Sequence, residues 1–221
     1  MHNTLSVTQV SKSFKGKTIL DNVSLECETG QIKGIFGRNG SGKSTLLKIL
    51  FGVLKADKIH ITLNQKHIAV EDIIPEQLIA YLPQDPFMPK YLKVRDIIPM
   101  YYNGDKQDKI FYAPKMHKIA NMKIGNLSMG ELRYAELLLV SNLSHPFLML
   151  DEPFSMIEPL YKEHIKEYLL NLKDKKGILI TDHYYRDVLD VSSNNLLLDK
   201  GSLITVTNQQ ELIEGGYLPK Q

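Results

Sequence analysis

The stretch GRNGSGKST, from Gly37 to Thr45, decides how the rest of the chain is interpreted. It contains three glycines, one lysine and three hydroxyl residues, and it directly follows the apolar residues Ile35 and Phe36. Its spacing is G-x-x-x-x-G-K-[ST], with a strand pattern before it and a leucine-rich helix pattern after it. Glycines let backbone N–H groups turn toward phosphate oxygens, and the start of the helix adds a positive dipole end. The stretch therefore predicts a nucleotide phosphate site.

Two side chains of this loop have separate predicted tasks. Lys43 places a positive charge on the β- and γ-phosphates, and the Ser44 hydroxyl is suited to ligate Mg²⁺. The other nucleotide-binding candidates are the remaining loop residues, Gly37, Arg38, Asn39, Gly40, Ser41, Gly42 and Thr45. A glycine-rich structural turn is the alternative, but the strand before the loop and the helix after it favour the phosphate site.

The overall composition is that of a globular protein with a sizeable core. The 221 residues fit one domain, or one domain with an insertion, and the net charge of +2 is too small to suggest nucleic-acid binding. No apolar run approaches the ~18 residues of a membrane span, and the N-terminal residues lack the apolar core of a signal peptide. Cys27 is the single cysteine, so no internal disulfide forms, and its neighbours predict a packed strand residue.

Strand and helix patterns alternate along the chain, which favours an α/β fold centred on a parallel sheet. Strands are expected at residues 4–10, 18–27, 31–36, 58–63, 79–82, 147–150 and 178–180. Helices are expected from Lys43 to about Val53, from Ser128 to about Leu143, and from Pro159 onward. Ser128 followed by Glu131 predicts a capping box at the start of the second helix.

The segment 85–127 differs in character, since it contains several prolines and many lysines. We expect an inserted, mostly helical lobe there, with a short helix at Val94–Ile98 that Pro99 ends or kinks. Its residues Phe87, Met88, Tyr91 and Leu92 either line a groove for a partner helix or pack beneath the lobe. Its lysines Lys106, Lys109, Lys115, Lys118 and Lys123 form either a solvated face or a membrane-facing one.

A pair of carboxylates follows the apolar run 147–150, in the stretch FLMLDEP. Asp151, at the strand end, is placed to hold Mg²⁺, and Glu152 is placed to polarise an attacking water. The alternative is a helix N-terminus with favourable charge, and the glycine loop makes that alternative much weaker.

Four further short motifs occur in order along the chain: Phe14 ahead of the loop, Gln84 in YLPQD, the stretch NLSMGE with Ser128 and Gly130, and His183 in ITDHYY. Together with the glycine loop and the carboxylate pair, they resemble the motifs of the ATP-binding-cassette ATPases. The resemblance runs from Leu5 to about Leu212. It implies one domain, 1–221, with a P-loop NTPase fold. A core of residues 1–84 and 128–221 would include an N-terminal antiparallel β part, and residues 85–127 would form the helical subdomain.

The resemblance also implies roles for single residues. Phe14 would stack on adenine, Gln84 would ligate Mg²⁺ and sense the γ-phosphate, and His183 would bond the γ-phosphate or the attacking water. Ser128 and Gly130 would cap the nucleotide that the other subunit binds. The implied catalytic group is Glu152, His183, Lys43 and Gln84, and the implied metal ligands are Ser44, Gln84 and Asp151.

The function that the resemblance implies is an ATP-hydrolysing subunit of a transporter. It would dimerise around two ATP molecules with a second ATPase subunit, a copy of itself or a paralogue. It would power separate transmembrane permease subunits from the cytoplasmic face of the membrane, with no nucleic-acid partner. A soluble ATP-gated clamp or assembly ATPase is the alternative. A small-molecule kinase explains neither NLSMGE nor His183.

The chain departs from the usual family pattern in two places. Met129 stands where the signature motif usually has glycine, and Glu131 stands where it usually has glutamine. After the carboxylate pair, Met156 and Glu158 replace the usual alanine and aspartate. We expect these changes to affect the rate of hydrolysis and the symmetry of the dimer more than ATP binding.

Overall fold

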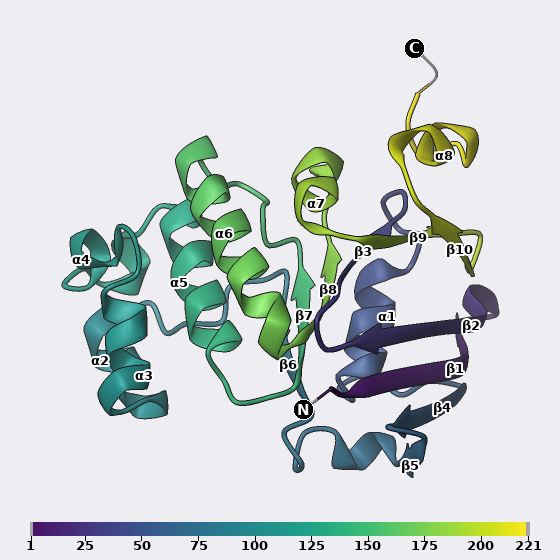
Figure 1. The fold of residues 1–221 in the computed structure, drawn as a ribbon, viewed down its shortest axis with the longest axis horizontal. Coiled ribbons are helices and arrows are strands. Elements are labelled where there is room, and N and C mark those ends of the chain that lie inside the picture. The colour runs from purple at the N-terminus through teal and green to yellow at the C-terminus, as the bar shows by residue number, and fades with distance from the viewer. Residues whose placement is uncertain (1, 220–221) are drawn as a thin grey trace.

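The computed structural model describes residues 2–219 and contains two β-sheets (Figure 1). The smaller sheet is antiparallel, with the strand order β2-β1-β4-β5. Its strands are β1 (Thr4–Phe14), β2 (Lys17–Glu28), β4 (Lys58–Leu63) and β5 (Lys66–Ile68). Along β2, Val23, Leu25 and Cys27 face the interior while the intervening residues are exposed, so Cys27 is a packed strand residue as predicted.

The larger sheet has six strands in the order β10-β9-β3-β8-β7-β6, and only β10 runs antiparallel to its neighbour. Its strands are β3 (Ile32–Phe36), β6 (Ile79–Leu82), β7 (Phe147–Asp151), β8 (Gly177–Thr181), β9 (Asn194–Asp199) and β10 (Ser202–Val206). Every residue of β7 and β8 is buried, as expected of parallel strands that are covered on both faces. The predicted α/β fold with a parallel-centred sheet and an antiparallel β part is confirmed.

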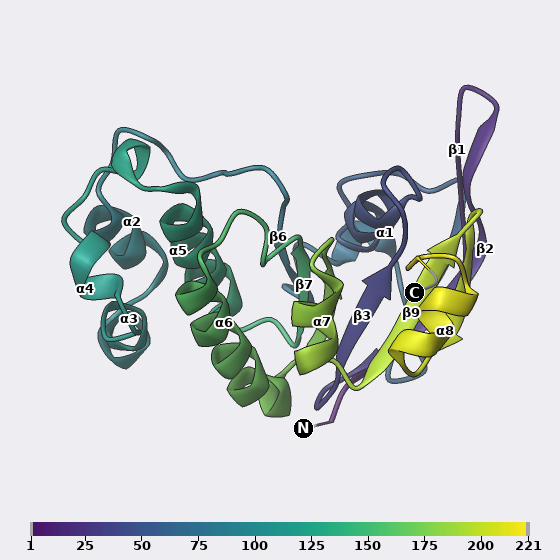
Figure 2. The same cartoon turned by 90° about the horizontal axis from the view of Figure 1, so that it is seen from above.

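Helices cover the sheets in two groups, as Figures 1 and 2 show. The first helix, α1 (Lys43–Leu50), packs between the two sheets, where Leu46 and Leu50 share a core with Val7 of β1 and Met149 of β7. Helices α5 and α6 lie between the larger sheet and a group made of α2, α3 and α4. The helices after α1 are α2 (Val94–Tyr101), α3 (Gly104–Phe111), α4 (Met116–Ile119), α5 (Met129–Ser141), α6 (Pro159–Leu172), α7 (Tyr185–Val191) and α8 (Gln209–Glu214).

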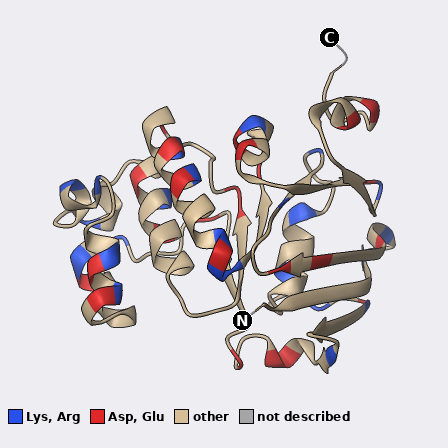
Figure 3. Cartoon of the chain, in the orientation of Figure 1, with Lys and Arg blue, Asp and Glu red and all other residues tan. Residues whose placement is uncertain are grey.

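Segment 85–127 contains α2, α3 and α4, so its expected helical character is confirmed. Apolar residues of these helices, such as Ile97, Ile110 and Ile119, belong to the same core cluster as Leu138 of α5. The hydrophobic core therefore runs without a break from this segment into the rest of the chain. Figure 3 shows that α2, α3 and α6 carry residues of both charge signs, whereas α4 carries only the positive Lys118.

The structure corrects one expectation about Pro99. This proline lies inside α2, which continues to Tyr101, so of the two predicted outcomes, an end or a kink of the helix, the first is wrong. Pro99 is the sixth residue of α2, so the helix lacks the hydrogen bond that an N–H at this position would donate to the Arg95 carbonyl. Burial of Val94, Ile97 and Ile98 holds the helix in place despite that loss. Within residues 2–219, no helix has the length and apolarity needed to cross a bilayer.

Candidate functional site

The glycine loop connects the end of β3 to the start of α1. Gly42 precedes the first helical residue with φ of +110°, and a Cβ there would approach a methyl carbon of Ile19 to 2.8 Å. Both its conformation and its surroundings therefore require glycine. The loop passes the N-terminus of α1, where unpaired backbone N–H groups face the site that the sequence predicts for phosphate.

Lys43 is the first residue of α1, and its side chain is 6% exposed. Its ammonium donates hydrogen bonds to the carbonyl oxygens of Gly37 at 2.7 Å and Arg38 at 3.3 Å. Burial lowers the pKa of Lys43, and the nearby carboxylates of Glu152, Asp151 and Asp182 oppose that shift. The ammonium thus lies between the glycine loop and a group of acidic side chains.

Asp151, the last residue of β7, is fully buried and accepts three side-chain hydrogen bonds. Ser44 Oγ donates to Oδ1 at 3.1 Å, Thr181 Oγ1 donates to the same oxygen at 2.7 Å, and the Tyr81 hydroxyl donates to Oδ2 at 3.2 Å. Burial and the Asp151 charge raise the pKa of Tyr81, which keeps its hydroxyl protonated as a donor. These contacts join α1 to β6, β7 and β8.

Tyr81 and Thr181 were absent from the predicted site. Thr181 ends β8 next to Asp151, and Tyr81 lies near the end of β6. The rule that ligand sites gather at the carboxyl ends of parallel strands could have identified Thr181.

Glu152 directly follows β7 and points its carboxylate toward His183. The Nε2 atom of His183 lies 2.7 Å from Glu152 Oε1, and Ser155 Oγ donates to Oε2 at 3.1 Å. The backbone of Glu152 adopts φ of +57°, which is unusual for a residue with a side chain. Its N–H donates to the Thr181 carbonyl at 2.7 Å, so the neighbouring strand helps to hold this conformation.

These residues surround a polar cavity of about 260 Å³. Its walls are formed by Asn39, Gly40, Lys43, Ser44, Gln84, Glu152 and His183. All seven are among the site residues predicted from the sequence, and they come from four separate stretches of the chain. The cavity therefore places a cation, hydroxyl and amide groups, a carboxylate and an imidazole around one space.

Other predicted nucleotide-binding residues lie outside this cavity. Phe14, at the end of β1, is 44% exposed, and Lys12 Nζ lies 5.0 Å from its ring centroid. Arg38 donates to the Gly216 carbonyl at 2.7 Å, so its guanidinium contacts the C-terminal part of the chain. The remaining loop residues, Gly37, Ser41, Gly42 and Thr45, support the loop without lining the cavity.

Ser128 and Gly130 stand at the start of α5, also outside the cavity. Ser128 Oγ accepts a hydrogen bond from the Glu131 N–H at 3.2 Å, and Glu131 Oε2 accepts one from the Ser128 N–H at 2.8 Å. The predicted capping box is confirmed. A Cβ on Gly130 would lie 3.3 Å from the Met156 carbonyl oxygen, so the start of α5 packs tightly on that segment.

A second cavity, of about 410 Å³, has Phe87 in its wall. It is lined mainly by apolar residues, Lys48, Phe51, Val53, Tyr81, Pro83, Phe87 and Val140. Phe87 is 42% exposed there, whereas Met88 is buried and Leu92 packs against the core. The sequence offered two alternatives for this segment, lining a groove or packing beneath the lobe. Phe87 follows the first, and Met88 and Leu92 follow the second.

Comparison with known proteins places this geometry in a family. The sequence profile described as "ABC transporter" matches residues 20–155, more than half of the chain. The chain belongs to the ABC transporter family of ATP-binding subunits. Its activity is ATP hydrolysis that powers the movement of a substrate, and a soluble clamp or assembly ATPase is not favoured.

Similar proteins include the lipopolysaccharide export system ATP-binding protein LptB of Acidithiobacillus ferridurans. It is 28% identical, and the match covers 97% of this chain and 94% of that protein. LptB of Escherichia coli K12 is 26% identical over 98% of this chain and 95% of that protein. A probable sulfate/thiosulfate import ATP-binding protein, CysA of Chlorella vulgaris, is 26% identical over 93% of this chain and 92% of that protein.

Solved structures show the same fold. An ATP-binding subunit of an ABC transporter superposes with a TM-score of 0.83 at 19% identity, covering 98% of this chain and 95% of that one. A dimeric ATP-binding cassette in a post-hydrolysis state, bound to ADP and Pi, has a TM-score of 0.80 at 19% identity. That match covers 92% of this chain and 98% of the other.

Proposed function

We propose that this subunit hydrolyses ATP at a site completed by a second ATPase subunit, a copy of itself or a paralogue. The observation that supports this is the separation of the predicted nucleotide contacts within one chain. Lys43, Ser44, Gln84 and Glu152 share one cavity, whereas the start of α5 at Ser128 lies outside it. In a head-to-tail pair, the α5 start of one subunit would cap the ATP held by the glycine loop of the other. Each subunit would thus contribute to both sites.

The donor groups at the cavity fit Mg²⁺. Ser44 and Gln84 line it, and the buried Asp151 lies behind Ser44, with its Oδ1 atom 3.1 Å from Ser44 Oγ. Among residues 2–219, no cluster of three or more His, Cys, Asp or Glu side chains forms a metal site. A hydroxyl, one carboxylate and one amide suit Mg²⁺, which takes its other ligands from phosphates and water. Bound there, the ion would neutralise charge on the phosphate oxygens.

The chain's own residues supply the remaining chemistry. Water attacks the γ-phosphorus, forming a new P–O bond as the bond to the ADP oxygen breaks. Glu152 accepts the proton of that water, and His183, which contacts the same carboxylate, holds Glu152 in place and reaches the γ-phosphate. Lys43 and the loop N–H groups stabilise the charge that develops on the phosphate oxygens. Phe14, exposed at the end of β1, supplies a flat surface for adenine.

Transmembrane permease subunits are the proposed partners of the apolar groove beside Phe87. A groove lined by Phe51, Val53 and Phe87 suits the apolar face of a helix. Docking there would hold the subunit at the cytoplasmic face of the membrane. The proposal also divides the single domain into a core, residues 1–84 and 128–221, and a helical lobe, residues 85–127. Relatives are named for both export and import.

The variant Glu152→Gln tests the shared site. Removal of the proton acceptor leaves ATP bound, so the full-length variant should shift from monomer to dimer in sizing chromatography when Mg-ATP is added. Lys43→Ala in the same background is the matched control and should remain monomeric. A variant that binds ATP and stays monomeric would contradict self-pairing and indicate a paralogous partner. A variant that does not bind ATP would contradict the assignment of the cavity.

A further inference from the structure

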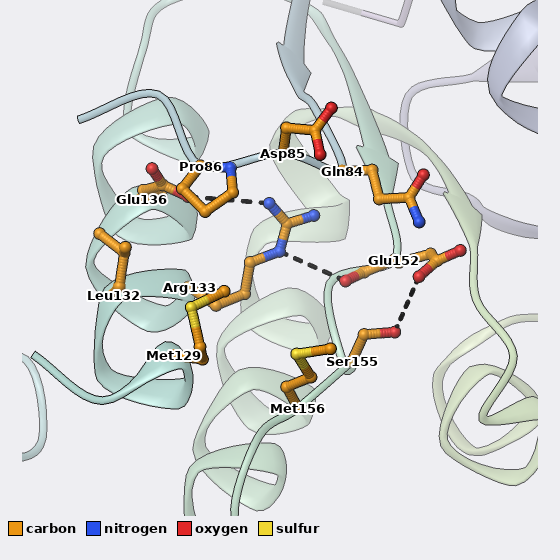
Figure 4. Close-up of a pocket in the computed structure, with 10 residues that line it drawn as sticks. All are labelled: Gln84, Asp85, Pro86, Met129, Leu132, Arg133, Glu136, Glu152, Ser155 and Met156. Carbon is orange, nitrogen blue, oxygen red and sulfur yellow. Dashed lines mark hydrogen bonds and ion pairs between the residues drawn. The ribbon is translucent and has the colours of Figure 1, made fainter.

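Two charged side chains are buried in α5, one helical turn apart. Arg133 is 6% exposed and Glu136 is fully buried, and Arg133 Nη1 lies 3.8 Å from Glu136 Oε2. Both line a cavity of about 190 Å³ that also contains Gln84 and Glu152 (Figure 4). Charged groups are rarely buried in this way unless each has hydrogen-bonding partners, so their contacts indicate what they hold.

Arg133 contacts the backbone around the Asp151–Glu152 carboxylate pair. Its guanidinium donates to three backbone carbonyls, that of Asp151, that of Glu152 at 3.3 Å and that of Pro83 at 2.5 Å. The first two carbonyls flank the residue that carries the catalytic carboxylate, and its φ of +57° needs support from its surroundings. The third belongs to the residue before Gln84. A rigid planar fork is suited to holding three acceptors at once.

Glu136 reaches toward the groove. Its Oε1 atom accepts hydrogen bonds from the N–H groups of Phe87 at 2.7 Å and Met88 at 3.1 Å. Its Oε2 atom is buried without a hydrogen bond, and the Arg133 guanidinium is the charge that faces it. Phe87 itself lines the apolar groove. One turn of α5 therefore links the backbone of the groove to the backbone around Glu152.

We propose that Arg133 and Glu136 are positioning residues that couple occupation of the groove to the position of the Glu152 carboxylate. This inference rests on the proposed function of the groove. A helix that pushes on Phe87 would move the backbone N–H groups of Phe87 and Met88, and Glu136 would follow because it accepts hydrogen bonds from both. Arg133 would then shift against the Asp151 and Glu152 carbonyls. Coupling between two sites is reciprocal, so nucleotide at the catalytic site must also change the groove.

That reciprocity provides a test that needs no membrane partner. The sequence has no tryptophan, so Phe87→Trp introduces a single tryptophan into the groove, and excitation near its absorption edge avoids the tyrosines. We would make this substitution in full-length Glu152→Gln protein and record its emission with and without saturating Mg-ATP. We expect Mg-ATP to shift the emission. Glu136→Gln keeps the acceptor for Phe87 and Met88 but removes the charge, and we expect it to reduce the shift about fivefold or more.

Arg133→Lys provides the second variant, because one ammonium cannot hold three carbonyls in the geometry of the fork. Glu163→Gln is the matched control, since Glu163 forms an exposed i,i+3 pair with Lys166 on α6. ATP affinity, measured separately with a fluorescent nucleotide, should stay within about threefold in each variant, since neither residue lines the nucleotide cavity. A full-sized shift in either folded variant, or no shift in the parent, would overturn the inference. Failure of ATP-dependent dimerisation would instead overturn the proposed shared site.

Discussion

The His183 Nε2 atom lies 2.7 Å from the Glu152 Oε1 atom, which connects the chain after β8 to the chain after β7. The two residues follow the ends of adjacent parallel strands, which are paired at Asp151 and Thr181, so the sheet brings them close together. Ser155 Oγ donates a hydrogen bond to the other carboxylate oxygen, Glu152 Oε2, at 3.1 Å. The Glu152 carboxylate is thus held on both sides, which orients it toward the cavity.

Replacement of His183 by alanine should slow turnover without weakening nucleotide binding. Without the imidazole, the Glu152 carboxylate loses one of its two supports and the γ-phosphate loses a donor. We expect kcat for ATP hydrolysis to fall about 10²-fold or more while KM changes little. Steady-state phosphate release measures both parameters. Tyr184→Phe, one residue further along, is the control, and parental kcat in His183→Ala would remove His183 from the catalytic group.

Replacement of Lys43 by alanine should act mainly on affinity. Its ammonium is the buried positive charge of the cavity, and hydrogen bonds to charged groups contribute about 1.5–3 kcal/mol each. We expect ATP to bind roughly 10- to 100-fold more weakly, as measured by calorimetry. Lys48→Ala is the matched control, because Lys48 lies on the same helix but lines the groove instead. Equal affinity in the two variants would contradict the phosphate role of Lys43.

Replacement of Glu131 by glutamine should strengthen ATP-dependent pairing. The Glu131 carboxylate lies at the N-terminus of α5, where it would face the phosphates of the partner's nucleotide. Glutamine keeps the capping box but loses the attraction between the carboxylate and the helix N-terminus, about 0.3–1 kcal/mol, so thermal stability should fall slightly. Loss of a like charge facing the phosphates removes a repulsion of about 1 kcal/mol at low salt, which corresponds to a roughly fivefold tighter dimer. Sedimentation of Glu152→Gln protein, with and without Glu131→Gln, measures the dissociation constant of the dimer in Mg-ATP. An unchanged dimer constant would show that Glu131 does not face the partner's nucleotide.

The stability of the protein should depend on Lys176 at alkaline pH. Burial lowers the pKa of Lys176 from 10.5 to about 8, and its ammonium donates to the Leu143 carbonyl at 2.5 Å. Between pH 8 and pH 10.5 the unfolded chain binds a proton that the folded chain lacks, so unfolding becomes harder as pH rises. Relative to Lys176→Met, the wild-type Tm should therefore rise by a few degrees across this window. A pH-independent difference between the two melting curves would contradict the lowered pKa.

The parts of the fold that were predicted correctly rest on local chemistry. The glycine loop, the Ser128–Glu131 capping box and the buried strand ending at Asp151 each depend on residues within a few positions of one another. For Pro99 the predicted outcomes were an end or a kink of the helix, and the first is wrong because α2 continues to Tyr101. Burial of Val94, Ile97 and Ile98 outweighs the hydrogen bond lost at the proline, and that burial depends on contacts with distant segments.

The site residues that were missed depend on contacts between distant segments. Arg133 and Glu136 look like ordinary surface charges on a helix, and only the packing of α5 against β6 and α6 buries them. Tyr81 acquires its role from a carboxylate 70 positions away. Neither the periodicity of apolar residues nor the spacing of motifs predicts contacts between segments so far apart in the chain. The groove was only half predicted for the same reason, since the fold buries Met88 and leaves Phe87 at the surface.

The cavity joins residues that are far apart in the chain, and this has a consequence for synthesis on the ribosome. Ser44 and Asp151 are 107 positions apart, and His183 is made later still. The glycine loop thus emerges long before the strands that complete its surroundings, because chains emerge from the N-terminal end. A ligand stabilises only the state that binds it. ATP in the cell will consequently protect nearly finished chains from proteolysis and give no protection to nascent chains that stop short of β8.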